Sequence, residues 1–305
     1  MADHQCVPFV ITLVSAAKLD AKTLKTARQI IEVTGGLDFQ KPHWLSPSKA
    51  VDIYCQLAPR QSLPLTEQLR QNLGNVDLVV QRAANRRKKL LVADMDATII
   101  EGESIDALAE KAGVGAQVAA ITEQAMQGRL DFTAALIKRV SALRGLPFTA
   151  IEEYLSEYRL NAGARELVAT TNLSGAQTML LSGGFDCIVR PISKKLGFKT
   201  SHCNHLTLDY ENKVAGTIRL PVMNAQRKLD MLEAEAKTLG LEPRQTLAIG
   251  DGANDIPMIR AAGMGIAYKA KEALRKQTPY QINHSDLLSV LFFQGFTQKE
   301  IVKRG

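Results

Sequence analysis

Three short apolar runs in the chain each end in polar residues that could handle a phosphate or a metal ion. The residues after the runs 90–93, 179–181 and 247–249 are Asp94-Met95-Asp96-Ala97-Thr98, Ser182-Gly183-Gly184 and Gly250-Asp251-Gly252-Ala253-Asn254-Asp255. Runs that are apolar on both faces are typical of parallel strands covered by helices. Ligands bind such sheets beyond the carboxyl ends of the strands, so we expect the three loops to converge on one site.

The aspartates of these loops would then share one crevice. Carboxylates held close together repel one another and resist ionisation unless a cation neutralises them. Oxygen ligands without a neighbouring His or Cys favour a hard cation, and Mg²⁺ is such a cation that also accepts phosphate oxygens. The sequence therefore predicts a magnesium site at the strand ends.

Individual residues of these loops suit the steps of phosphoryl transfer. Asp94 and Asp96 are two residues apart at a strand end, where a period of two would point both side chains to one face, one to attack and one to move a proton. Ser182 and the two glycines after it open a predicted helix, whose N–H groups and hydroxyl could bind an anion. Lys228 could add positive charge for the phosphoryl group. Each motif alone is common in turns, and their joint occurrence at strand ends is what indicates a catalytic site.

The order of elements from residue 90 onward predicts an α/β domain. Strands alternate with helices except in the block 104–160, which has helical periodicity and no strand signal. We therefore expect a doubly wound, mostly parallel, Rossmann-like sheet with an inserted helical cap at about 104–165 that acts as a mobile lid.

The first 81 residues have the pattern of a small α+β domain. Strands at 9–14, 50–57 and 76–81 and helices at 20–33 and 64–73 give a βα…βαβ order, with the second strand unclear around 43–45. This order suits a ferredoxin-like fold. We divide the chain into an accessory domain (1–81), a basic linker (82–89) and a catalytic domain (90–305).

The net charge of +7 is concentrated at the N-terminal end of the chain. Residues 1–89 carry 13 basic and 7 acidic side chains, whereas the rest of the chain carries 25 and 24. Five of the basic residues fall between 82 and 89, and we expect this run to be a solvated hinge. A basic chain suggests a polyanion partner. Because aromatic stacking platforms and a recognisable reading helix are absent, we expect no nucleic-acid partner.

Cysteine and hydropathy patterns favour a cytoplasmic protein. The four cysteines form no CxxC pair, which fits free thiols in a reducing compartment. The apolar run 7–14 lacks the basic flank of a signal peptide and is better explained as a buried strand. No apolar run reaches the ~18 residues that a membrane span needs. His202, Cys203 and His205 lie close together in the sequence but lack a fourth ligand, so we do not expect zinc.

The loop motifs together with Lys228 resemble the four motifs of the haloacid dehalogenase-like phosphohydrolases. Four longer segments are similar to the phosphoserine phosphatase branch of that family: Asp94–Asp106, Ile121–Leu146, Ser182–Asp186 and Ala248–Tyr268. The similarity covers roughly residues 88–296, about two-thirds of the chain. It implies Mg²⁺-dependent hydrolysis of O-phospho-L-serine to L-serine and phosphate, the last step of L-serine biosynthesis, through a phosphoaspartate intermediate.

The resemblance assigns catalytic and metal-binding roles. Asp94 is the nucleophile, and Asp96 is the general acid and then the general base. Mg²⁺ is held by the carboxylates of Asp94 and Asp251 and by the backbone carbonyl of Asp96.

The resemblance also assigns the phosphate-binding residues. Ser182, Gly183 and Lys228 bind the phosphoryl oxygens. Asn254 and Asp255 support the metal shell and orient Lys228 and the phosphate.

Substrate choice, by the same resemblance, belongs to the cap. Arg139 offers a bidentate fork to the substrate carboxylate, and Glu103 offers an anion to the substrate ammonium group. Met126 and Phe132 form an apolar lid, and Asn254 is counted among the substrate-binding residues. Without the resemblance, Arg139 is a solvated helix charge and Glu103 a helix N-terminal acid.

Two parts of the chain depart from the family pattern. Ala97 stands where the family often has serine, in a position that mainly contributes backbone. Residues 1–80 resemble, more distantly, the ACT-like domain of some phosphoserine phosphatases, which pairs subunits or binds amino acids. We favour packing or dimerisation for this segment, and a homodimer stays open.

Two other functions stay open from the sequence. One is a phosphatase for another phosphorylated amino acid or small metabolite. The other is an amino-acid sensor with an inactive hydrolase core, but this would require a missing nucleophile, acid or metal ligand, and none is missing. In every case we expect a small-molecule ligand and no membrane partner.

Overall fold

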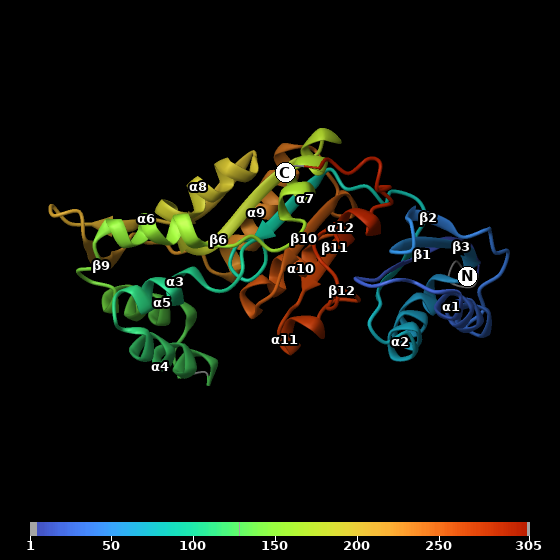
Figure 1. Ribbon diagram of the computed structural model, residues 1–305, viewed down its shortest axis with the longest axis horizontal. Helices are drawn as coiled ribbons and strands as arrows, with labels where there is room; N and C mark the ends of the chain where they lie inside the picture. The colour runs from blue at the N-terminus through green and yellow to red at the C-terminus, as the bar shows by residue number, and fades with distance from the viewer. Residues whose placement is uncertain (1–4, 128, 304–305) are drawn as a thin grey trace.

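A single sheet of ten strands runs through the whole protein (Figure 1), in the order β2-β3-β1-β4-β12-β11-β10-β5-β6-β7. The computed structural model describes residues 5–127 and 129–303, with the side chain of Met126 excepted. Within this sheet, the strands from residue 90 onward pair with one another in parallel, whereas the four N-terminal strands pair with one another antiparallel. The expected mostly parallel α/β sheet from residue 90 onward is confirmed.

The catalytic part of the sheet has helices on both faces. Its strands are β5 (Leu90–Asp94), β6 (Gln177–Phe185), β7 (Thr200–Asn204), β10 (Thr246–Gly250), β11 (Met264–Tyr268) and β12 (Tyr280–Ile282). Its helices are α7 (Ala164–Leu173), α8 (Asp186–Leu196), α9 (Ala225–Thr238), α10 (Ile256–Ala261), α11 (Glu272–Arg275) and α12 (Leu288–Phe293), with single 3₁₀ turns at Pro243–Gln245 and Ala253–Asp255. Alternate residues of β5 enter different cores, Leu90 and Val92 on one face and Leu91 and Ala93 on the other. The all-apolar strand runs are therefore explained by burial on both faces.

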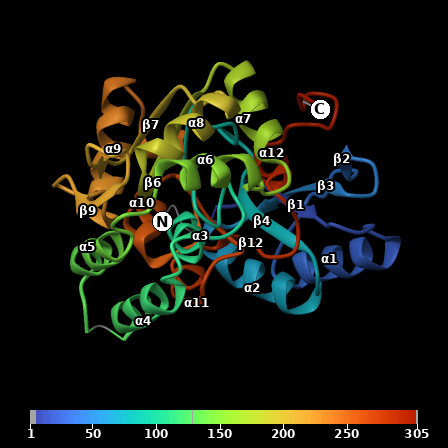
Figure 2. The ribbon, with the colours of Figure 1, turned by 60° about the vertical axis from the view of Figure 1, so that its left-hand side comes forward.

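Four helices without a strand form the cap between β5 and β6. They are α3 (Ser104–Lys111), α4 (Gly115–Met126), α5 (Phe132–Ala142) and α6 (Phe148–Glu157). A hairpin of β8 (Leu206–Leu208) and β9 (Val214–Ile218) reaches from the core to the cap, where the N–H of Gly145 donates to the carbonyl of Val214. Figure 2 shows the cap helices and this hairpin together on one side of the molecule.

The N-terminal region has a βαββαβ order. Its elements are β1 (Val7–Val14), α1 (Ala21–Val33), β2 (His43–Ser46), β3 (Ala50–Leu57), α2 (Ser62–Asn72), preceded by a 3₁₀ turn at Pro59–Gln61, and β4 (Asp77–Arg82). The strand that was unclear in the sequence is β2. Asp20 caps α1, because its carboxylate accepts from the N–H of Thr23 at 2.7 Å. Both helices lie on one face of the sheet, over an apolar core of their own.

Two residues of the basic run 82–89 do not fit the solvated hinge that its composition suggested, whereas Arg82, Arg87 and Lys89 are exposed. Arg86 is 9% exposed, and its guanidinium forms a bidentate pair with the fully buried Asp52 at 2.7 and 3.0 Å. Lys88 donates to the carbonyl of Arg244 at 2.9 Å. The expectation is wrong for these residues, because a charged segment between two packed units can find partners on both of them.

Within the described residues, no helix is long and apolar enough to cross a membrane.

Candidate active site

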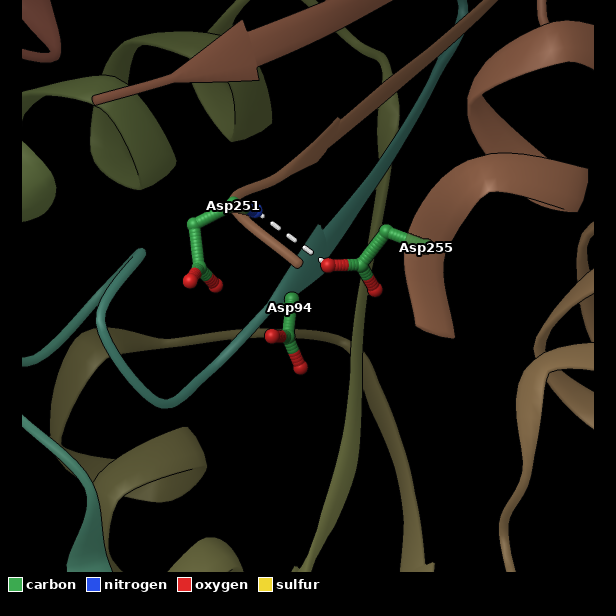
Figure 3. Close-up of side chains that lie close together, drawn as sticks. All are labelled: Asp94, Asp251 and Asp255. Carbon is green, nitrogen blue, oxygen red and sulfur yellow. Dashed lines mark hydrogen bonds between the residues drawn. The ribbon is translucent and has the colours of Figure 1, made fainter. Parts of the chain in front are cut away.

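Three buried carboxylates meet at the carboxyl ends of β5 and β10, as the sequence motifs predicted (Figure 3). Asp94 ends β5, Asp251 follows β10, and Asp255 lies in the 3₁₀ turn at Ala253–Asp255. Oxygen atoms of the three side chains lie within 4.8 Å of one another. Lys228, fully buried in α9, donates to Oδ1 of Asp94 at 2.6 Å and to Oδ1 of Asp255 at 2.8 Å. Two of the three predicted loops and Lys228 therefore converge here.

The three carboxylates have different partners. Asp255 accepts from Lys228 through Oδ1 and from the N–H groups of Asp251 and Gly252, each at 3.2 Å, through Oδ2. Asp251 accepts a long bond of 3.4 Å from the hydroxyl of Thr98 at one oxygen. Both oxygens of Asp255 are thus engaged by the protein. Asp94 and Asp251 each keep an oxygen without a hydrogen bond in the described structure.

The negative charge of these three carboxylates favours the binding of a cation. Desolvation and the neighbouring Asp255 raise the pKa of Asp94 well above its usual value, against the attraction of Lys228. Desolvation, followed by repulsion from Asp255, raises the pKa of Asp251 to about 6. Burial alone would lower the pKa of Lys228, but Asp255 and Asp94 raise it above its usual value, so this ammonium stays charged. One ammonium facing three carboxylates leaves negative charge that a bound metal ion would neutralise.

Asp96 joins the site by a different route from the one the sequence suggested. The strand ends at Asp94, so the two-residue period does not orient Asp96. Its carboxylate instead accepts from the N–H of Ser104 at 2.7 Å and from the hydroxyl of Ser182 at 3.1 Å. The Ser182 hydroxyl accepts from the N–H of Gly184 at 2.8 Å. Asp96 therefore connects the first motif to the second and to the start of the cap.

The backbone between Asp96 and the cap is held by Asn161, a residue that the sequence did not single out. Its side-chain amide donates to the carbonyls of Thr98 at 2.9 Å and Ile100 at 3.1 Å. Ala97 has a φ of 53°, and its N–H donates to the carbonyl of Gly102 at 2.8 Å. Ala97 thus contributes a turn in the backbone, in line with what was expected of this position.

Asn204 at the end of β7 is a second residue that the sequence did not reveal. Its amide donates to the carbonyl of Gly183 at 2.8 Å and accepts from the N–H of Met223 at 2.7 Å. A Cβ at Gly184 would lie 3.0 Å from the Ser182 hydroxyl and 3.3 Å from an Asp96 oxygen, so a larger residue there would have to push these side chains aside. The phosphate-binding loop proposed from the sequence is therefore held from both sides.

The cap places an aromatic ring over this loop. A Cβ at Gly183 would meet the ring of Phe132 at 3.4 Å, so the first residue of α5 lies against the second motif. The side chain of Met126, the other expected lid residue, lies outside the described residues. Asn254 is half-buried in the 3₁₀ turn beside Asp255.

Glu103 and Arg139 lie on the cap side of the site. Glu103 is exposed as a whole, yet the surrounding protein desolvates its carboxyl, and this with repulsion from Asp96 and Asp251 raises its pKa to about 7. Desolvation lowers the pKa of Arg139, against the attraction of Asp106, Glu103 and Asp96. The Nε of Arg139 is buried without a hydrogen-bond partner in the described structure. A guanidinium with a free N–H can donate hydrogen bonds to an anionic group of a ligand.

The comparisons with known proteins agree with this geometry. Residues 91–260 match the family model of the haloacid dehalogenase-like hydrolases. The phosphoserine phosphatase of Streptococcus thermophilus is 43% identical over 204 residues, which are 67% of this chain and 94% of that protein.

A second relative and a solved structure cover more of the chain. The phosphoserine phosphatase SerB2 of Mycobacterium tuberculosis is 40% identical over 229 residues, which are 74% of this chain and 56% of that protein. A hydrolase of the same family from Salmonella enterica has a structure with a TM-score of 0.84 and 28% identity, covering 94% of this chain and 98% of its own. The chain therefore belongs to the haloacid dehalogenase-like hydrolase family, within its phosphoserine phosphatase branch.

Proposed function

We propose that this protein hydrolyses O-phospho-L-serine to L-serine and phosphate through a phosphoaspartate, as the last step of L-serine biosynthesis. The observation that carries the proposal is the meeting of the Asp94, Asp251 and Asp255 cluster with Lys228, Asp96 and the Ser182 hydroxyl at one sheet edge. The relatives named phosphoserine phosphatase support the choice of substrate.

Asp94 is the nucleophile in this proposal. Its carboxylate attacks phosphorus and forms an acyl phosphate while the bond to the serine oxygen breaks. Lys228 holds one oxygen of this carboxylate, which leaves the other oxygen for attack. Asp96 protonates the departing oxygen and then takes a proton from the water that hydrolyses the acyl phosphate. The N–H of Ser104 and the hydroxyl of Ser182 orient the Asp96 carboxylate for both steps.

The residues present fit Mg²⁺. The Asp94 oxygen that does not attack, a free oxygen of Asp251 and the backbone carbonyl of Asp96 would hold the ion, and Asp255 would position Lys228 and the loop amides around them. When bound, Mg²⁺ supplies positive charge that offsets the phosphate and the clustered carboxylates. The hard oxygen ligands of the cluster, with no His or Cys among its three acids, favour this ion.

Phosphate and serine are recognised by different parts of the site. Ser182, Gly183 and Lys228 bind the phosphoryl oxygens. Arg139 binds the substrate carboxylate, and Glu103 binds the substrate ammonium group. Phe132 and Met126 cover the site, and Asn254 contacts substrate and phosphate from the third loop. Closure of the cap would exclude bulk water while the phosphoryl group passes to Asp94.

We further propose that the N-terminal region is a ferredoxin-like, ACT-like domain that packs or pairs subunits in a cytoplasmic enzyme. Its βαββαβ order and its strand order β2-β3-β1-β4 support this assignment. A homodimer would be tested by the mass of the protein in solution.

The reaction is tested by phosphate release from O-phospho-L-serine with and without Mg²⁺. We expect release to need Mg²⁺ and to vanish in Asp94→Asn, because the amide is a poor nucleophile. Lys194→Ala, at an exposed position of α8, is a control for handling and should keep full activity. Full activity of Asp94→Asn would overturn the proposal.

Specificity for phosphoserine over another phosphorylated metabolite is tested at Arg139. Arg139→Ala should lose about 10²-fold in kcat/KM on phosphoserine, because a charged hydrogen-bond partner is removed from a desolvated group. Activity on p-nitrophenyl phosphate, which has no carboxylate, should change little. An equal loss on both substrates would mean that Arg139 does not bind the carboxylate.

A further inference from the structure

Asp77, the first residue of β4 in the N-terminal region, binds a turn of the catalytic region. It is 3% exposed, and its carboxylate accepts from the N–H groups of Asn283 at 2.7 Å, His284 at 3.1 Å and Ser285 at 2.8 Å. The hydroxyl of Ser285 donates to the same carboxylate at 2.5 Å. Backbone N–H groups that donate to a buried carboxylate form strong hydrogen bonds. The turn after β12 is therefore held by a residue about 200 positions away in the sequence.

The strand before this turn has little support of its own. β12 has three residues, pairs in parallel with β11 on one side, and meets β4 through the single pair Gln281 and Leu78 on the other. At its start, the carbonyl of Pro279 accepts from the guanidinium of Arg70 in α2 at 2.9 Å. Both ends of β12 are thus held by side chains of the N-terminal region.

β12 is connected to the active site through the segment 269–271. The N–H of Lys269 donates to the carbonyl of Ile282, the last residue of β12, at 2.7 Å. Two residues later, the N–H of Lys271 donates to the carbonyl of Asp251 at 3.0 Å. Lys269 has a φ of 43°, a conformation that a non-glycine residue keeps only where its surroundings determine it. A displacement of β12 would therefore move the backbone that supports Asp251.

The relatives indicate that this support is an addition to the catalytic unit. The match to the Streptococcus protein takes up 94% of that protein but only 67% of this chain, which leaves that protein little room for an N-terminal region. In this chain, Asp77 and Arg70 of the N-terminal region hold the two ends of β12.

We propose that Asp77 is a positioning residue for the active site, which acts through the turn at 283–285, β12 and the segment 269–271 on the Asp251 loop. It touches neither substrate nor metal. The proposal rests on the proposed phosphatase activity only for its kinetic readout.

The first test measures amide hydrogen exchange in Asp77→Asn. This variant keeps the shape of the side chain, but it removes the charge and replaces one acceptor oxygen by an NH₂ group that cannot accept from the N–H donors. Exchange in 280–285 and in the peptides containing 251–252 and 269–271 should each become about 10-fold faster, since charged hydrogen bonds to buried N–H groups are lost. Ser285→Ala removes a single donor and should give a smaller change in the same peptides. This milder variant decides the question if Asp77→Asn does not fold.

A matched control breaks the junction elsewhere. Gln81 donates to the carbonyl of Phe293 at 2.6 Å, away from β12. Gln81→Met should lower the melting temperature without changing exchange at 251–252. If both Asp77→Asn and Ser285→Ala loosen 280–285 but leave 251–252 and 269–271 as in the unmodified protein, the inference is wrong and Asp77 is merely structural.

A second readout is the binding of Mg²⁺ by calorimetry at a temperature where all variants are folded. Asp77→Asn should raise the Kd for Mg²⁺ by about 10-fold, because a displaced Asp251 carboxylate would bind the ion less well. The value of kcat/KM should fall as well, since the nucleophile Asp94 shares that ion. Gln81→Met should leave the Kd unchanged, and an unchanged Kd in Asp77→Asn would count against the inference. Failure of the unmodified protein to release phosphate would overturn the proposed function and leave the exchange test in force.

Discussion

At the scale of single residues, the acids of the site differ in what remains free on each carboxylate. Both oxygens of Asp255 accept hydrogen bonds, one from Lys228 and the other from two backbone N–H groups, so this residue positions its neighbours. Asp94 gives one oxygen to Lys228 and keeps the other. Asp96 accepts from one N–H and one hydroxyl, which orient its carboxylate. Sequence spacing alone could not assign these differences.

The pKa of Glu103 makes a prediction for the dependence of activity on pH. Its folded-state pKa of about 7 lies above the ordinary value of 4.5, so in the free enzyme this carboxyl is protonated below pH 7 and ionised above it. Only the ionised form can pair with the substrate ammonium group. kcat/KM for phosphoserine should therefore rise between pH 6 and pH 8, with an apparent pKa near 7.

The control for this prediction is Glu103→Gln, measured over the same pH range. The rise in kcat/KM that is due to ionisation of Glu103 should disappear in this variant. Its kcat/KM for phosphoserine should also be lower than that of the unmodified enzyme at pH 8. The phosphate group of phosphoserine itself titrates near pH 6 and could contribute to the rise. We therefore use p-nitrophenyl phosphate as a second substrate, because it has a phosphate group but no ammonium group for Glu103 to bind. An unaltered pH profile in Glu103→Gln would show that another group is responsible.

At the scale of elements, the loops of the site are held in place by side chains from neighbouring helices and strands. The loop after β6 carries Ser182 and Gly183, and Asn204 from β7 and Phe132 from α5 lie against it. The loop after β5 is held by Asn161, which precedes α7. The strand ends bring the motifs together, and neighbouring elements then determine their orientation.

Asn204→Ala should impair catalysis more than its cost in stability explains. It removes two hydrogen bonds of a buried amide, which costs about 1–3 kcal/mol in the free energy of unfolding. It also frees the carbonyl of Gly183, and a shifted phosphate loop should lower kcat/KM by about 10-fold or more. Steady-state kinetics with denaturant unfolding would measure both effects.

Asn172→Ala is the matched control for Asn204. Asn172 also joins two groups, donating to the carbonyl of Gly197 at 2.7 Å and accepting from the hydroxyl of Thr178 at 2.9 Å, but it lies away from the site. Because Asn172 is half-buried, its loss should cost somewhat less stability than that of Asn204, and it should leave kcat/KM unchanged. Equal kinetic losses in the two variants would show that loop position is not what Asn204 provides.

At the scale of the whole molecule, the N-terminal and catalytic regions share a sheet and part of a core. Val14, Leu45, Ala50 and Val79 of the N-terminal sheet pack in one apolar cluster with Phe292 and Phe293 of α12. Arg86 lies between them, since its guanidinium donates to Asp52 in β3 on one side and, at 3.4 Å, to the carbonyls of Phe292 and Phe293 in α12 on the other. The two regions are therefore packed against each other over both apolar and polar contacts.

Arg86→Met should be strongly destabilising. The substitution would leave the fully buried Asp52 without its ionic partner, which costs about 3–5 kcal/mol. Arg87→Ala, the neighbouring change, removes a pair with Glu300 in which both side chains are about half exposed, and should cost about 1 kcal/mol. Denaturant unfolding compares the two, and equal costs would mean that the Arg86 pair contributes no more than a surface pair.

Local patterns in the sequence were sufficient to predict several parts of this protein. Apolar runs without alternation predicted the strands β5, β6 and β10, because burial on both faces requires apolar residues throughout. Their polar ends predicted the converging loops, since parallel strands present their carboxyl ends at one edge. The helical cap and the order of the N-terminal elements followed from periodicity in the same way. The domain boundaries stay predictions.

The tertiary structure alone decided which distant residues support the site and how the two regions meet. Asn161, Asn204, Asp77 and Arg86 have no local pattern that marks them, because a single polar residue is as common on a surface as at a junction. Arg86 pairs with Asp52, 34 positions away, and Asp77 bonds across the two regions to Ser285, 208 positions away. Burial of such a residue depends on the packing of whole elements against one another, which periodicity and spacing do not contain. The basic run 82–89 therefore looked like a solvated hinge in the sequence, yet in the folded chain Arg86 lies buried against the N-terminal sheet.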